Sequence, residues 1–159
     1  MNLFAINLLL AVIWVGLTNS LSFLGLVSGY LVSFAALWLT RPLYGASTGY
    51  FVKSVNLVEL ALFFVYDLCV SSIRVAWDVL TPQTRSNPAI LEVPLDVESD
   101  LEILLVTNLI SLTPGTLSLD VSPDRKVLYV HAMFADDPDA VIADLKNGME
   151  RMVRRVFVV

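Results

Sequence analysis

Two carboxylates stand out in this sequence, because each lies in a stretch that is otherwise largely apolar. Glu59 and Asp67 fall within a run from about Leu57 to Ile73 in which most side chains are hydrophobic. Ionisable groups inside a membrane are costly and often mark a path for protons or cations. The competing interpretation is an amphipathic helix whose polar side faces lipid headgroups or a partner subunit. We favour the amphipathic helix.

These carboxylates belong to a polar stripe on a helix predicted over about 52–80. Its members recur near a 3.6-residue period, which places them on one side of the helix. Arg74 and Asp78 stand four residues apart and can pair. The stripe consists of Asn56, Glu59, Asp67, Ser71, Arg74 and Asp78.

Other residues that could do chemistry have simpler structural interpretations. Residues 45–49 match the nucleophile motif G-x-S-x-G, but that motif needs a strand before it, a helix after it and a histidine base. Here it falls between two helices, and we expect a loop. The single histidine, His131, is expected to be structural, and the single cysteine, Cys69, to pack on the apolar side of its helix. We therefore expect no enzyme activity, no cofactor and no metal site.

The elements that position these residues begin with a membrane segment, since the first 40 residues carry no charged side chain. As a helix rising about 1.5 Å per residue, they would span about 60 Å, twice the hydrocarbon core of about 30 Å. Residues 18–20 (Thr-Asn-Ser) can form a turn in the middle. We therefore predict helices over about 2–18 and 21–39, the second ending at Arg41-Pro42. Three small residues would let helices approach closely: Gly16, Gly25 and Gly29.

The sequence is compatible with either two or three membrane crossings. With two crossings, all ten Lys and Arg residues lie on one side, which satisfies the positive-inside rule. With three crossings, Arg41 and Lys53 would lie opposite Arg74 and Arg85. We favour two crossings, with the helix over 52–80 lying partly embedded at the cytoplasmic surface, and the three-span alternative stays open.

A small cytoplasmic α+β domain is predicted after Pro88. It is acidic, with 12 acidic against 6 basic residues over 86–159. This balance argues against a nucleic acid partner. Apolar alternation, a capping box and an amphipathic stripe predict the order β-α-β-β-α. The elements are strands at 90–97, 117–121 and 127–134, and helices at 99–112 and 138–157. Pro94 places the first strand at an edge. The predicted organisation is a transmembrane hairpin (1–40), an interfacial loop with the amphipathic helix (41–85) and the α+β domain (86–159).

Three segments resemble one known family. The run Ile110-Ser111-Leu112-Thr113-Pro114-Gly115-Thr116 is similar to the signature of the E subunit of Mrp-type (Mnh or Pha) multisubunit cation/proton antiporters. Residues 129–132 (Tyr-Val-His-Ala) resemble a histidine-containing strand of that family, and residues 74–82 resemble the end of its third helix. Chain length and element order match as well.

The resemblance implies a bacterial inner-membrane complex that exchanges sodium or potassium for protons. Large A and D subunits are thought to carry the ion pathways. This chain would be a multi-pass accessory or assembly subunit that packs against those subunits, against small membrane subunits and against lipid. The alternatives are direct ion translocation through Glu59 and Asp67, or a membrane-tethered regulatory domain.

No catalytic residue follows from the resemblance, only candidates for structure and interaction. Gly115 can adopt the positive φ that a helix-to-strand reversal needs, and Pro114 fixes the approach. The candidates are Glu59, Asp67, Arg74, Asp78, Pro114, Gly115, Thr116 and His131.

Overall fold

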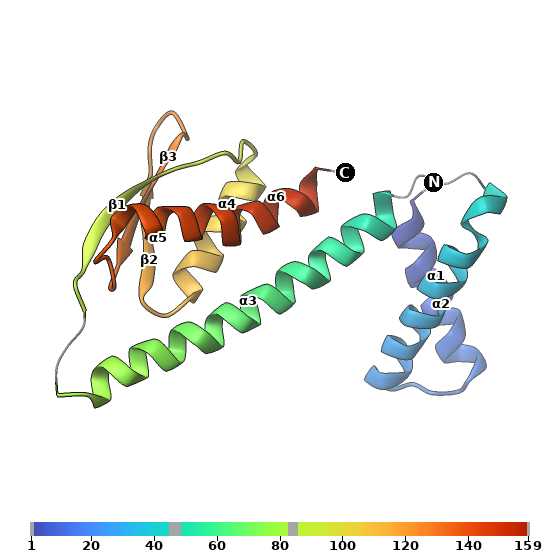
Figure 1. Ribbon diagram of the computed structural model, residues 1–159. Coiled ribbons are helices and arrows are strands. Elements are labelled where there is room, and N and C mark those ends of the chain that lie inside the picture. Colours follow the sequence, from blue (N-terminus) through green and yellow to red (C-terminus); the bar gives the residue numbers. More distant parts are fainter. Residues whose placement is uncertain (1, 45–48, 83–85, 159) are drawn as a thin grey trace. The chain divides into compact units, whose positions relative to one another are not determined.

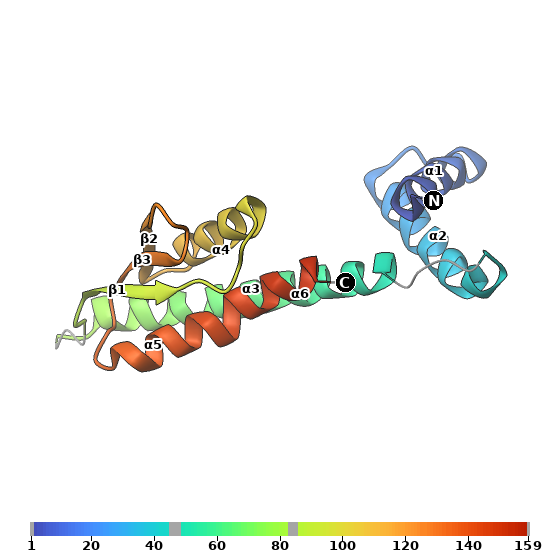
Figure 2. The same cartoon turned by 90° about the horizontal axis from the view of Figure 1, so that it is seen from above.

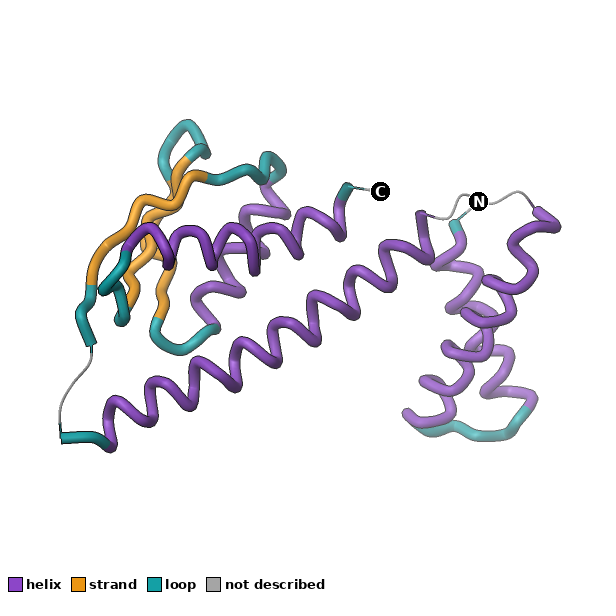
Figure 3. The backbone as a smooth tube through the Cα atoms, in the orientation of Figure 1, coloured by secondary structure: helices purple, strands orange, loops and turns teal. Residues whose placement is uncertain are grey.

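The chain divides into two compact units, Met1–Val52 and Lys53–Val159, and the computed structural model describes residues 2–44, 49–82 and 86–158. Figure 1 identifies the helices and strands by label. In the described residues, all of the β-structure belongs to the second unit, as the orange strands of Figure 3 show. The predicted combination of apolar N-terminal helices and a small α+β domain is therefore confirmed.

The first unit is built on a helical hairpin of α1 (Leu3–Leu17) and α2 (Phe23–Tyr44). Asn2 caps α1 by accepting a hydrogen bond from the Ala5 amide. Between the helices Asn19 adopts φ 49°, a left-handed conformation that asparagine tolerates better than most residues. The predicted break at residues 18–20 is thus confirmed.

Two of the three predicted small-residue contacts hold the hairpin together. A Cβ on Gly29 would lie 2.9 Å from the carbonyl oxygen of Ala11, which is fully buried. A Cβ on Gly25 would lie 2.2 Å from the carbonyl oxygen of Ser20, so the turn also requires glycine. Gly16 has nothing within 4 Å of its Cβ position, so it does not contribute to the packing of this unit.

The second helix does not end at Arg41-Pro42, as the sequence predicted, but continues to Tyr44. Pro42 lies in the last turn of α2. Its missing N–H removes only the hydrogen bond to the Trp38 carbonyl, and the helix ends two residues later, so the loss disrupts little of the helix. The Arg41 guanidinium lies 5.2 Å from the centroid of the Trp38 ring, a cation–π contact at this end.

Among the described residues, two helices are long and apolar enough to cross a membrane. They are α2 and the longer α3 (Gly49–Leu80, 32 residues), whereas α1 is apolar but has 15 residues. At about 1.5 Å per residue, α1 spans about 22 Å, less than the hydrocarbon core of about 30 Å.

The second unit contains a three-stranded antiparallel sheet in the order β1-β3-β2. Its elements follow in the predicted order β-α-β-β-α, and Pro94 ends the edge strand β1 as expected. The strands are β1 (Ala89–Pro94), β2 (Thr116–Val121) and β3 (Val127–Ala132). The first and third strands are shorter than predicted.

A β-bulge in β2 changes which residues face the core. The pairing with β3 shifts between Ser118 and Asp120, so Leu119 is the extra residue. Leu117 and Leu119 are consequently about half exposed, while Val121 faces the core beside Leu128. The simple alternation predicted for 117–121 is wrong because the bulge reverses the faces partway along the strand.

The helices of the second unit pack over one face of the sheet. The helix α4 (Asp100–Leu112) begins at the predicted capping box, with Ser99 and Glu102 each bonding the other's backbone amide. The predicted helix over 138–157 is found with the same bounds, as α5 (Pro138–Leu145), a π-helical turn η1 (Lys146–Glu150) and α6 (Arg151–Phe157). Figures 1 and 2 both place α6 beside the first half of α3.

A turn at residues 122–126 joins β2 to β3. Arg125 adopts φ 61° there, and the Ser122 hydroxyl donates to Asp124 Oδ1 over 2.6 Å. That hydrogen bond, together with one from the Lys126 amide, lowers the pKa of the Asp124 carboxyl below its ordinary value.

Candidate functional site

One side of α3 is part of the hydrophobic core of the α+β domain. Leu60 is buried in that core, and Phe63 and Phe64 pack against it. A Cβ on Gly148 would lie 3.0 Å from Phe63 Cζ, so the π-helical turn η1 presses closely on α3. The domain thus includes α3 as its own docking helix.

Asp67, a member of the predicted polar stripe, contacts Thr113 of the segment 110–116 that resembles the family signature. The Thr113 hydroxyl lies 3.3 Å from Asp67 Oδ2 and 3.0 Å from the Leu109 carbonyl oxygen, and it donates toward both. Thr113 is 6% exposed and Asp67 is half-buried, so this contact is partly buried. The carboxylate of α3 therefore contacts the C-terminus of α4, where the motif begins.

The helix-to-strand reversal has the backbone geometry that the sequence predicted. Gly115 adopts φ 94°, in the left-handed region. The Thr116 hydroxyl donates to the Ile110 carbonyl, 2.7 Å away, which also accepts from the Thr113 amide, so both bonds help to close the end of α4. A Cβ on Gly115 would lie 3.5 Å from Val75 Cγ2, so this reversal rests against α3.

A cavity of about 160 Å³ lies between α3 and this reversal. It brings together five of the predicted candidates, while Glu59, Asp78 and His131 lie elsewhere. Among its lining residues are Asp67, Arg74, Pro114, Gly115, Thr116 and Asp144. Two carboxylates and one guanidinium make the cavity polar on the α3 and α5 sides.

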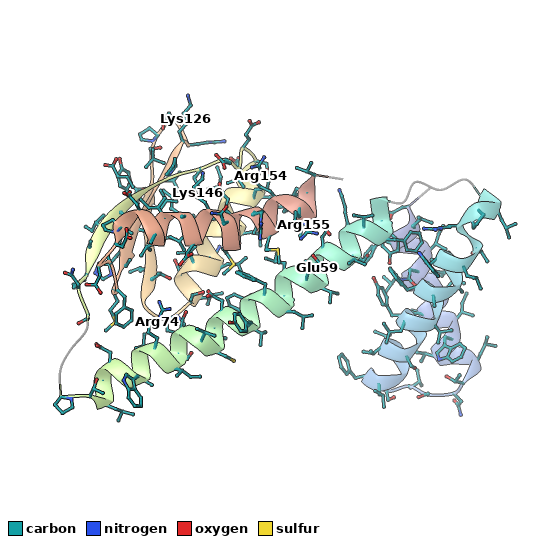
Figure 4. All side chains as sticks on the ribbon, viewed as in Figure 1. Glu59, Arg74, Lys126, Lys146, Arg154 and Arg155 are labelled. Carbon is teal, nitrogen blue, oxygen red and sulfur yellow. The ribbon has the colours of Figure 1, made fainter. Side chains whose placement is uncertain are left out.

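Glu59 fixes the other end of the docking helix. Its Oε2 lies 3.1 Å from Nη1 of Arg155, and Figure 4 shows the two side chains pointing toward one another from α3 and α6. The Asn56 side-chain amide donates to the backbone carbonyl of Arg155. Both charged side chains are about half exposed, so the ion pair contributes at most about 1 kcal/mol. Together with the Asn56 contact, it joins the N-terminal half of α3 to α6.

Asp78 and His131 lie outside the cavity, and Arg74 lines it. Asp78 is 5% exposed and Arg74 is exposed. The pair that the sequence suggested between them is not among the ion pairs of the described residues. His131 is half-buried on the sheet face opposite Val130 and Ala132, which it shares with Tyr129.

The opposite side of α3 is apolar and exposed. Leu62, Tyr66, Ile73 and Trp77 are each between 59% and 69% exposed. Cys69 lies on this apolar side, as predicted, and its side chain is exposed. It lies on this uncovered side of the helix, where the domain supplies no neighbour to bury it.

The sequence analysis missed a second set of polar contacts around η1. Glu150 is 3% exposed, and its Oε1 accepts hydrogen bonds from the amides of Asp96 and Val97. Lys146 Nζ donates to the Pro94 carbonyl oxygen, 2.6 Å away, and lies 3.0 Å from Asp96 Oδ2. These residues tie the last helix to the end of β1. A charged residue within the apolar stripe of a helix was the signal that could have identified Glu150.

The first unit contains a polar contact among its helices. Asn7 is fully buried and donates to the Tyr50 hydroxyl over 2.7 Å, and the hydroxyls of Tyr30 and Tyr50 lie 3.0 Å apart. Buried hydrogen bonds of this kind fix the register of packed helices. The first turn of α3 is thus joined to α1 and α2.

The described residues offer no arrangement for metal catalysis. Within residues 2–44, 49–82 and 86–158, no group of three or more His, Cys, Asp and Glu side chains is placed to hold a metal ion. The G-x-S-x-G sequence falls largely on residues 45–48, which lie outside the described part of the chain. The described contacts around α3 join this helix to α4, η1 and α6.

Apolar N-terminal helices, followed by a small α+β domain whose docking helix keeps an uncovered apolar side, define a subunit of a membrane complex. The model of the Na+/H+ ion antiporter subunit family matches residues 7–156, and the chain belongs to this family. The resemblance to antiporter E subunits is therefore confirmed.

Individual relatives agree over nearly the whole chain. The E subunit of the Na(+)/H(+) antiporter of Bacillus subtilis (strain 168) is 32% identical over 151 residues, and that of Alkalihalophilus pseudofirmus is 34% identical over 151 residues. Each alignment covers 95% of both chains.

Two solved structures were also matched. A chain of the membrane-bound sulfane sulfur reductase, an archaeal respiratory membrane complex, has a TM-score of 0.60 at 23% identity, with 98% of both chains covered, and shares the fold. A chain of the Mrp complex from Dietzia sp. DQ12-45-1b is 30% identical, with a TM-score of 0.48, over 62% of this chain and 93% of that one.

Proposed function

We propose that this chain is an accessory subunit of a multisubunit Na+/H+ antiporter in a bacterial inner membrane. Its hairpin anchors it, and its α+β domain supports assembly from the cytoplasmic side, against the larger ion-translocating subunits. The observation that carries this proposal is the two-sided character of α3. One side is docked on the domain, and the other leaves Leu62, Tyr66 and Trp77 for lipid or a partner subunit.

The length of the docked side supports a surface position for α3. Contacts with the domain run from Asn56 to Val75, which is about 28 Å of helix at about 1.5 Å per residue. A crossing helix needs an apolar surrounding over about 30 Å. Here one side faces a domain that brings Arg155 and Asp144 close to α3. Charged groups at that depth are costly, so α3 fits better along the surface with its apolar side embedded.

Cysteine accessibility tests this topology. In a Cys69→Ser background, Leu43→Cys reports the end of α2, Lys126→Cys reports the α+β domain, and Leu21→Cys reports the turn of the hairpin. We expect an impermeant thiol reagent to label Leu43→Cys and Lys126→Cys from the cytoplasmic side and Leu21→Cys from the other. Labelling of Leu43→Cys and Lys126→Cys from opposite sides would show that α3 crosses.

Co-purification tests the accessory role. The tagged chain, solubilised gently from its native membrane, should carry the large antiporter subunits with it, and deleting the chain should lower their amount in the membrane. Recovery of the chain alone, with unchanged levels of the large subunits in the deletion strain, would sink the proposal.

A further inference from the structure

A second hollow lies toward the C-terminal end of the docking helix and adjoins the polar cavity, with which it shares Arg74, Phe134 and Asp144. It has a volume of about 560 Å³ and is bounded by the last turns of α3, by Phe134 and by the N-terminal half of α5. We call it the acidic groove. Its floor is apolar and includes Val70, Ile73 and Trp77. Ile73 and Trp77 are 69% and 59% exposed, so the domain itself does not cover this floor.

The rim of the acidic groove is negatively charged. Asp136, Asp137 and Asp144 line it and are exposed, against the single guanidinium of Arg74. Asp136 accepts from the Asn87 side chain and Asp137 caps α5, so these two carboxylates are held in place. An apolar floor with a fixed acidic rim fits a ligand that is apolar in the middle and cationic at its edges.

We propose that the acidic groove binds a basic, amphipathic segment at the cytoplasmic end of a membrane helix of a partner subunit. Cytoplasmic ends of membrane proteins carry an excess of lysine and arginine beside apolar helix ends. Lipid fits less well, because the cytoplasmic leaflet is anionic and the rim aspartates would face its headgroups. The floor is continuous with the uncovered apolar side of α3, which the proposed function places at the membrane surface.

This inference rests on the proposed function but fails separately from it. If the chain does not assemble with membrane subunits, the proposed function is wrong. If it assembles through other surfaces, only the acidic groove is reassigned.

Photo-crosslinking in the intact complex identifies the occupant. A benzophenone amino acid replaces Trp77 in the groove and, as a matched control, Leu101, which is exposed on α4 away from the groove. We expect the Trp77 probe to form an adduct with a peptide that contains several lysines or arginines beside an apolar stretch. An adduct with lipid, with a neutral or acidic peptide, or with nothing in the assembled complex overturns the proposal.

Charge reversal tests the rim. Asp144→Lys reverses a groove carboxylate, and Asp139→Lys makes the same change on the same helix outside the groove. We expect Asp144→Lys to reduce co-purification of the partner by up to about fivefold, and the remaining complex to lose its sensitivity to salt. Asp139→Lys should match the unaltered chain. Equal effects of the two variants, or unchanged salt sensitivity in Asp144→Lys, contradict the assignment.

Discussion

At the residue scale, Gly115 combines a backbone requirement with a packing contact, and the two can be separated. Its φ of 94° costs about 1–2 kcal/mol for a residue that carries a Cβ. The nearest atoms to a Cβ there are 3.5 Å away or more, so space alone does not exclude alanine. We predict that Gly115→Ala lowers the free energy of unfolding by about 1–2 kcal/mol, and Gly115→Asn by less.

Thermal unfolding of the detergent-solubilised chain, followed by near-ultraviolet circular dichroism, measures this difference. The matched variant Leu112→Ala, at the exposed last residue of α4, controls for a change that leaves φ untouched. Equal losses for alanine and asparagine at position 115 would show that sterics, rather than φ, require the glycine.

Glu59 and Asp67 allow a test of the ion-path alternative. Each has a partner within the domain, Arg155 for Glu59 and Thr113 for Asp67. An amide keeps the size of the side chain and its ability to accept a hydrogen bond. We predict that Glu59→Gln and Asp67→Asn leave sodium/proton exchange in membrane vesicles within about twofold of the unaltered complex, since an exposed ion pair contributes about 1 kcal/mol or less.

The amount of assembled complex must be measured in the same vesicles. A variant that assembles normally but loses exchange would establish a direct role for that carboxylate in ion transfer.

At the element scale, the close contact between α1 and α2 depends on Gly29. A Cβ there would approach the Ala11 carbonyl oxygen to 2.9 Å, whereas the Cβ position of Gly16 is open. We predict that Gly29→Leu forces the two helices apart and lowers the aggregation temperature of the chain in detergent. The matched change Gly16→Leu should leave it within a few degrees of the unaltered chain. A similar loss for both variants would indicate that the bulk of leucine, and not the helix contact, is responsible.

The elements show which features the sequence could predict. The capping box Ser99–Glu102 and the glycine at the reversal are local, so they located α4 and its end correctly. The polar stripe of α3 followed from its helical period, and Asp67 and Glu59 indeed face the domain.

Other features depend on tertiary packing and escaped prediction. The bulge at Leu119 arises from pairing with β3, and the π-helical turn brings Gly148 against Phe63, a residue far away in sequence. The end of α2 was misplaced because a proline in the last helical turn removes only one hydrogen bond.

The sequence identified residues of the candidate site but did not predict that they lie together. The sequence identified Asp67, Arg74 and the segment 114–116 separately, and their meeting at one cavity depends on how α3 docks. The position of Glu150 within the apolar stripe of the last helix was a signal in the sequence, but its partners, the amides of residues 96 and 97, are distant in sequence and are revealed only by the fold.

At the scale of the whole molecule, the uncovered side of α3 should bind membranes even without the hairpin. Fully burying a side chain such as Leu62 or Ile73 contributes about 1.5–3 kcal/mol relative to leaving it in water, and several such residues share this side. We predict that a chain lacking residues 2–48 still floats with liposomes of bacterial lipid and is released by detergent. Adding Leu62→Lys and Tyr66→Lys should abolish flotation, because both side chains are exposed and the domain-facing side of α3 is untouched.

Flotation separates membrane binding from aggregation, since aggregates sediment. If the truncated chain without the lysines stays in the aqueous fraction as a monodisperse protein, then α3 does not embed by itself, and its apolar side must be covered by another protein subunit instead.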